Sequence, residues 1–125
     1  MRSAITALQM GIRAAGVVQL VLGLAFWTGN ALGLVDLHQL VGMLLVLGLW
    51  TLAALAARAG VQPGLVAVAA VWGLILPVVG LTQRELLAGS AHIVIEVVHL
   101  LLGLGALGLA ETLATRAKAR MAPVA

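Results

Sequence analysis

The chain has 125 residues and a formal net charge of +3, and 63% of its residues are hydrophobic while only 9% are charged. A soluble domain carries about a quarter charged residues, so this composition excludes a soluble fold and predicts an integral membrane protein. There is no cysteine, which excludes disulfides, iron–sulfur clusters and thiolate metal sites.

Four apolar segments are long enough to cross a bilayer, whose hydrocarbon core takes about 20 residues of helix. They predict one all-α transmembrane domain over residues 1–125, a four-helix bundle with short loops. We expect the helices at about residues 11–28, 36–57, 63–82 and 90–113. Pro63 suits the first turn of the third helix.

The basic residues predict how this bundle sits in the membrane. All but one of them lie near the start of the first helix, after the second or after the fourth: Arg2, Arg13, Arg58, Arg116, Lys118 and Arg120. The positive-inside rule then predicts an up-down-up-down topology with both termini cytoplasmic, in a cell membrane such as a bacterial inner membrane. Because the positive charge has this topological explanation, we expect no nucleic-acid partner. Abundant small residues, which let membrane helices pack closely, favour a homo-oligomer surrounded by lipid.

The fourth predicted helix carries the polar residues that point to chemistry. At about 100° per residue, one narrow face presents His92, Glu96, His99 and Gly103, followed by two alanines, Ala106 and Ala110. Ionisable side chains are costly in hydrocarbon and persist there mainly where they bind a ligand, pair or move protons. This face is therefore predicted to point into the bundle.

The second predicted helix offers another imidazole, His38, with Gly42 one turn away. The segment Leu37–Gly42 echoes Val98–Gly103, since each has an apolar residue, then His, then Gly four positions later. Two imidazoles from two helices could bind a haem iron on both sides, and the glycines would leave room for the porphyrin.

With these features the chain resembles the four-helix transmembrane b-type cytochromes of the cytochrome b561 group. The resemblance rests on His38 with Gly42, on His99 with Gly103 and on the helix count. It implies haem b held between helices, with His38 and His99 as axial ligands, and electron transfer with a quinone or another redox partner. The chain would then be a possible membrane oxidoreductase. A second, widely spaced ligand pair is missing, so one haem per chain is the simpler expectation, while the third histidine leaves open a second site at a subunit interface.

Helix depth leaves the choice of the ligand pair open. His38 lies 20 residues before Arg58, whereas His92 lies 19 and His99 only 12 before Glu111. With Glu111 as the membrane edge, His38 is level with His92, and His99 is about 10 Å deeper at 1.5 Å per residue. Depth thus favours His92 as the second ligand, and the glycine pattern favours His99.

Two alternatives of other classes remain. Imidazole and carboxylate also suit a divalent transition metal such as zinc, or a proton pathway, built from the histidines and Glu96. Glu96 could instead orient a ligating imidazole by hydrogen bonding. The third possibility is a non-catalytic membrane subunit whose polar face a partner helix covers.

Overall fold

The computed structural model describes residues 1–87 and 89–122, and the described part is helical apart from short connections. The elements in chain order are α1 (Arg2–Trp27), η1 (Leu32–Leu34), α2 (Val35–Arg58), α3 (Pro63–Thr82), η2 (Gln83–Glu85), η3 (Gly89–Ala91) and α4 (His92–Arg120). The prediction of an all-α fold with four long helices is confirmed. All four helices are long and apolar enough to cross a membrane.

Glycine and proline mark the connections. Gly29 follows α1 with φ +74° and Gly60 follows α2 with φ +79°, backbone conformations that cost glycine little because it has no Cβ. Pro63 starts α3, as predicted, because the first turn of a helix needs no N–H from that residue.

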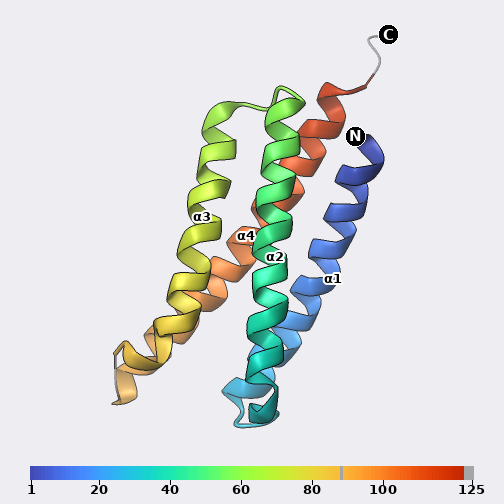
Figure 1. Ribbon diagram of the computed structural model, residues 1–125. Helices are drawn as coiled ribbons and strands as arrows, with labels where there is room; N and C mark the ends of the chain where they lie inside the picture. The colour runs from blue at the N-terminus through green and yellow to red at the C-terminus, as the bar shows by residue number, and fades with distance from the viewer. Residues whose placement is uncertain (88, 123–125) are drawn as a thin grey trace.

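Consecutive helices run in opposite directions (Figure 1). Both α2 and α4 contact every other helix, whereas α1 and α3 do not touch one another within the described residues. One end of the bundle holds the start of α1, the connection between α2 and α3, and the end of α4; we call it the basic end. The other holds residues 28–34 and, after α3, residues 83–87 and 89–91, and these two regions lie well apart in Figure 1; we call this end the open end.

The tightly packed core occupies the half of the bundle next to the basic end. It consists of the first part of α1, the second part of α2 and the second part of α4, with a few residues of α3. Its largest fully buried side chains are Ile5, Val46, Leu49, Leu52 and Leu113. Ala106 and Ala110, predicted to allow close helix packing, are 0% and 1% exposed. The half next to the open end is packed less tightly and contains the cavity described below.

Two helices extend beyond their predicted bounds at the basic end. The first begins at Arg2 instead of about residue 11, and the fourth ends at Arg120 instead of about residue 113. The apolar stretches are shorter than the helices because the added turns are amphipathic. They bury one face, including Ile5 and Ala117, and leave Arg2, Arg116 and Arg120 exposed.

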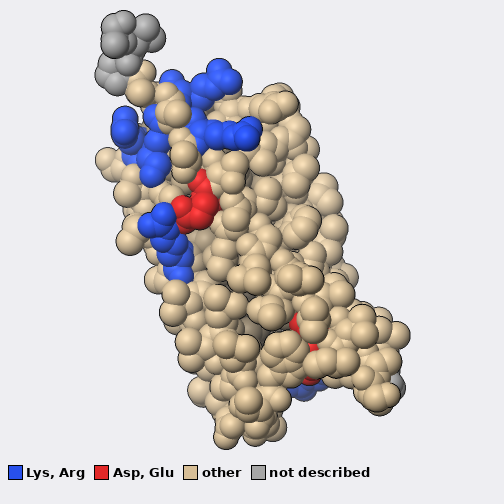
Figure 2. Space-filling model, turned by 180° about the vertical axis from the view of Figure 1, so that it is seen from behind, with Lys and Arg blue, Asp and Glu red and all other residues tan. Residues whose placement is uncertain are grey.

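A polar network joins these extensions. Arg13 donates from Nε to Glu111 Oε1 (2.6 Å) and from Nη2 to Glu111 Oε2 (2.7 Å). The buried Gln9 donates to Glu111 Oε2 (2.6 Å) and accepts from Lys118 Nζ (2.7 Å). Lys and Arg side chains gather at this end of the molecule (Figure 2). Arg13 thus pairs with the neighbouring helix, and Glu111 belongs to the α1–α4 contact.

Candidate functional site

A cavity of about 440 Å³ lies between the helices in the half next to the open end, and all four helices contribute to its wall. This volume falls within the range of about 300–1,000 Å³ typical of small-molecule sites. The wall is mostly leucine, valine and glycine. Its polar side chains are Gln19, His38, Gln39, Gln83, Arg84, His92, Glu96 and His99.

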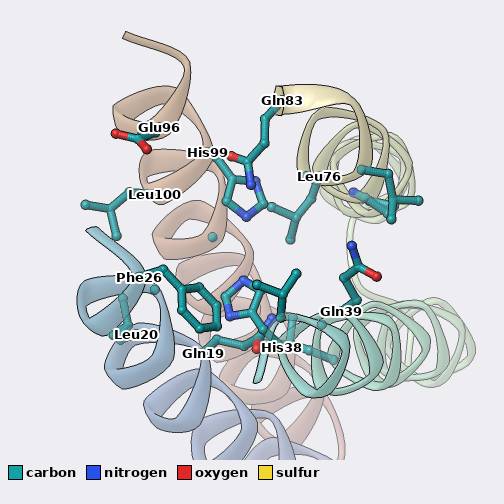
Figure 3. A pocket seen from close by; sticks show the side chains of 18 of the residues that line it. Gln19, Leu20, Phe26, His38, Gln39, Leu76, Gln83, Glu96, His99 and Leu100 are labelled. Carbon is teal, nitrogen blue, oxygen red and sulfur yellow. The ribbon is translucent and has the colours of Figure 1, made fainter. Parts of the chain in front are cut away.

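His38 and His99 face one another across this cavity (Figure 3). The two ring centroids are 6.3 Å apart and the ring planes are inclined by 54°. His38 comes from α2 and His99 from α4, the two helices that contact all others. A transition metal bonded to one nitrogen of each ring at about 2 Å would set the two centroids roughly 6 Å apart. The observed separation is therefore suited to one metal atom held between the two imidazoles.

Three buried polar atoms at the cavity have no hydrogen-bond partner among the described residues: Gln19 Oε1, His38 Nδ1 and His99 Nδ1. A buried polar group without a partner costs about 1–3 kcal/mol, so such atoms are rare unless a ligand or water meets them. Gln19, His38 and His99 all line the cavity, so unused hydrogen-bonding capacity of the described residues is concentrated around it.

Neighbouring groups restrict both rings. The Phe26 ring meets His38 edge to face, with centroids 5.3 Å apart. Beside His99 stands Gly80 of α3, where an added Cβ would lie 2.8 Å from His99 Cε1. Gly23 of α1 lies less close to His38: a Cβ added at Gly23 would be 3.8 Å from His38 Cε1. The glycines that make room for the imidazoles thus lie on α1 and α3.

The two glycines that the sequence singled out both line the cavity, with different surroundings. A Cβ added at Gly103 would meet nothing within 4 Å, so this position leaves open space. A Cβ added at Gly42 would lie 2.6 Å from Gln19 Nε2. The room at Gly42 is therefore taken by the Gln19 carboxamide, which corrects the expectation that both glycines leave free space.

His92 and Glu96 lie at the mouth of the cavity, and neither forms a hydrogen bond with His99. Trp27 Nε1 donates to Glu96 Oε2 (2.6 Å), and His92 Nε2 lies 3.7 Å from Glu96 Oε1. His92 donates from Nδ1 to the Leu86 carbonyl (3.1 Å). The carboxylate of Glu96 joins α1 to α4 at the mouth and does not bond to His99, so it does not orient that ring.

The helix ends explain why the depth argument favoured His92. His38 lies 20 residues before the end of α2 at Arg58, and His99 lies 21 residues before the end of α4 at Arg120. The two residues are therefore level when depth is counted from the ends of the helices. Counting from Glu111 placed His99 too deep relative to His38, because α4 continues beyond Glu111 to Arg120.

The alternative metal site gains no support from this arrangement. Among residues 1–87 and 89–122, no three or more His, Cys, Asp or Glu side chains converge as a metal site would require. His92 and Glu96 are engaged at the mouth, and His38 and His99 face each other further in. A zinc site needs four ligands, or three and a water, and the facing pair supplies two.

Sequence reasoning missed several residues of the site, notably Gln19, Gly23, Phe26 and Gly80. All lie on α1 or α3. No motif marks them, since a lone Gln or Gly in an apolar segment is ordinary. Their role follows only from the packing of α1 and α3 around the two histidine-bearing helices.

No family model matches the chain, and neither a curated protein nor a solved structure is significantly similar to it.

Proposed function

We propose that the chain is a membrane haem b protein that transfers electrons, with His38 and His99 as the two axial ligands. The observation that carries the proposal is the pair of imidazoles facing each other 6.3 Å apart across the cavity. Their separation suits one iron atom, and the open space at Gly103 suits part of a large planar ligand.

The four helices are proposed to span the membrane in the orientation that puts the basic end on the cytoplasmic side. The large apolar side chains exposed along them would then face lipid. They include Val17, Val21, Leu40, Leu44, Leu74 and Leu101. The open end, with the mouth of the cavity, lies on the opposite side.

Electron transfer is favoured over gas binding by the number of ligands. Haem iron exchanges one electron between its ferric and ferrous states, and axial ligands and surroundings set its potential. If His38 and His99 both held the iron, no position on it would be open to a gas molecule. Phe26 packs edge to face on His38, and the absence of a side chain at Gly80 makes room for His99, so these two imidazoles would be positioned to hold the group.

The test replaces each histidine in turn. His38→Ala and His99→Ala should each lose most of the haem from protein purified in detergent, measured as the Soret absorbance per chain. His92→Ala is the matched control, since His92 lies on α4 one turn before Glu96 and bonds to Leu86; it should retain haem and an unchanged spectrum.

Folding of the variants is checked by gel filtration, and added imidazole should restore part of the spectrum of a His99→Gly variant. Full haem content in both His38→Ala and His99→Ala would exclude this ligand pair. Loss in His38→Ala and His92→Ala, with haem retained in His99→Ala, would instead favour the pair His38 and His92.

A further inference from the structure

The rim of the cavity holds one cationic side chain, Arg84. It belongs to the short helix η2 that follows α3, and it lines the cavity at the open end. Within residues 1–87 and 89–122, Arg84 makes no hydrogen bond or ion pair with another side chain. An arginine that flanks an apolar cavity in this way can bind an anionic group carried by the guest.

The acidic groups of the open end leave this guanidinium available. Glu96 lines the mouth too, but its carboxylate accepts a hydrogen bond from Trp27 and lies 3.7 Å from His92 Nε2. The other two carboxylates of this end, Asp36 and Glu85, do not line the cavity. Next to Arg84, the neutral Gln83 amide adds a donor to the rim.

The position of Arg84 is also unexpected from topology alone. Every other Lys and Arg of the chain lies at or toward the basic end. In a membrane protein of the proposed orientation, a lone arginine on the opposite side works against the charge bias that fixes orientation. A binding role accounts for it.

We propose that Arg84 binds the carboxylate groups of the guest, whose apolar body occupies the cavity. This rests on the proposed function. For haem b it means that the two propionates point to the open end and meet Arg84, while the iron lies between His38 and His99. The opposite orientation would bring two carboxylates against the closely packed, apolar core, where charge is costly.

The test compares two iron porphyrins that differ only in these carboxylates. Apoprotein in detergent is titrated with iron protoporphyrin IX and with its dimethyl ester, and binding is followed by the Soret band. Wild type should bind the free acid about 10- to 100-fold more tightly than the ester, as expected for charge-assisted hydrogen bonds.

Arg84→Gln should remove this preference and keep the affinity for the ester, and Arg84→Lys should retain part of the preference. Arg58→Gln, which removes a cation at the basic end, should leave the preference unchanged.

The outcomes separate the two proposals. Equal binding of both porphyrins by wild type, with a spectrum that depends on His38 and His99, overturns the role of Arg84 and leaves the haem proposal standing. A parallel loss of affinity for both porphyrins in Arg84→Gln and Arg84→Lys gives Arg84 a structural role and likewise overturns its assignment. Failure of wild type to bind either porphyrin overturns both proposals.

Discussion

At the scale of single residues, two glycines of α4 can be substituted to test where the guest lies. Gly103 and Gly108 both lie on α4, and a Cβ added at either meets nothing within 4 Å. Only Gly103 lines the cavity. The two positions therefore form a matched pair for testing whether the cavity holds the guest.

We expect Gly103→Leu to weaken haem binding, because the new side chain fills space that the porphyrin would occupy. Overpacking costs about 1–3 kcal/mol, which corresponds to about 5- to 150-fold in affinity. Gly108→Leu should leave the affinity unchanged. The measurement is a haem titration of each apoprotein, and equal affinities for the two variants would place the guest elsewhere.

The histidines themselves could be found from the sequence, since an ionisable side chain in an apolar segment stands out. The partner of Glu96 could not, because Trp27 lies on another helix and its indole reaches the carboxylate only through the packing of α1 against α4. Gln19 was unpredictable for the same reason. Its carboxamide lies against Gly42 of α2, and no spacing along the chain encodes that contact.

At the scale of the helices, the α1–α4 contact depends on one carboxylate that collects several donors. Glu111 accepts hydrogen bonds from Arg13 and from the buried Gln9. Removing it leaves the buried Gln9 amide without this acceptor and Arg13 without its counter-ion, and a buried donor without a partner is costly.

We therefore expect Glu111→Ala to lower the thermal unfolding midpoint in detergent by several degrees. Glu85→Ala, at an exposed carboxylate of the open end, should change it little. Adding Arg13→Ala to Glu111→Ala should recover part of the loss, since the unpaired cation is then gone. An unaltered midpoint in Glu111→Ala would show that the network adds nothing to stability.

Apolar runs predicted the number and order of the helices but underestimated two of their lengths. Hydropathy marks the stretch that suits hydrocarbon, whereas a helix continues as long as one of its faces is buried. Ile5 and Leu113 are completely buried in the turns near the basic end, although charged residues interrupt the apolar pattern there. This underestimate also misplaced His99 in depth.

At the scale of the whole molecule, the charge distribution gives an expectation for topology. Reporter fusions should locate residues 1, 60 and 122 on the cytoplasmic side and residue 30 on the other side. The physical reason is the excess of Lys and Arg at the basic end. A cytoplasmic reporter at residue 30 would reverse the proposed orientation and move the mouth of the cavity to the cytoplasmic side.

The molecule combines a packed half and a hollow half, and the sequence predicted room beside the two histidines but not which half is hollow. Small residues that recur every three or four positions on one helix face, such as Ala106 and Ala110, indicate close packing. The cavity lies in the other half, where the ends of the two helical hairpins diverge (Figure 1). That divergence depends on the directions of whole helices, which no local pattern specifies.

The central claim is that His38 and His99 hold one haem, and the absorption spectrum of the purified wild-type protein tests it most directly. After expression with an adequate haem supply, we expect a red protein with a Soret band, one haem b per chain, and sharp visible bands on reduction, as two axial imidazoles produce. A colourless protein that also fails to take up added haem would contradict the claim.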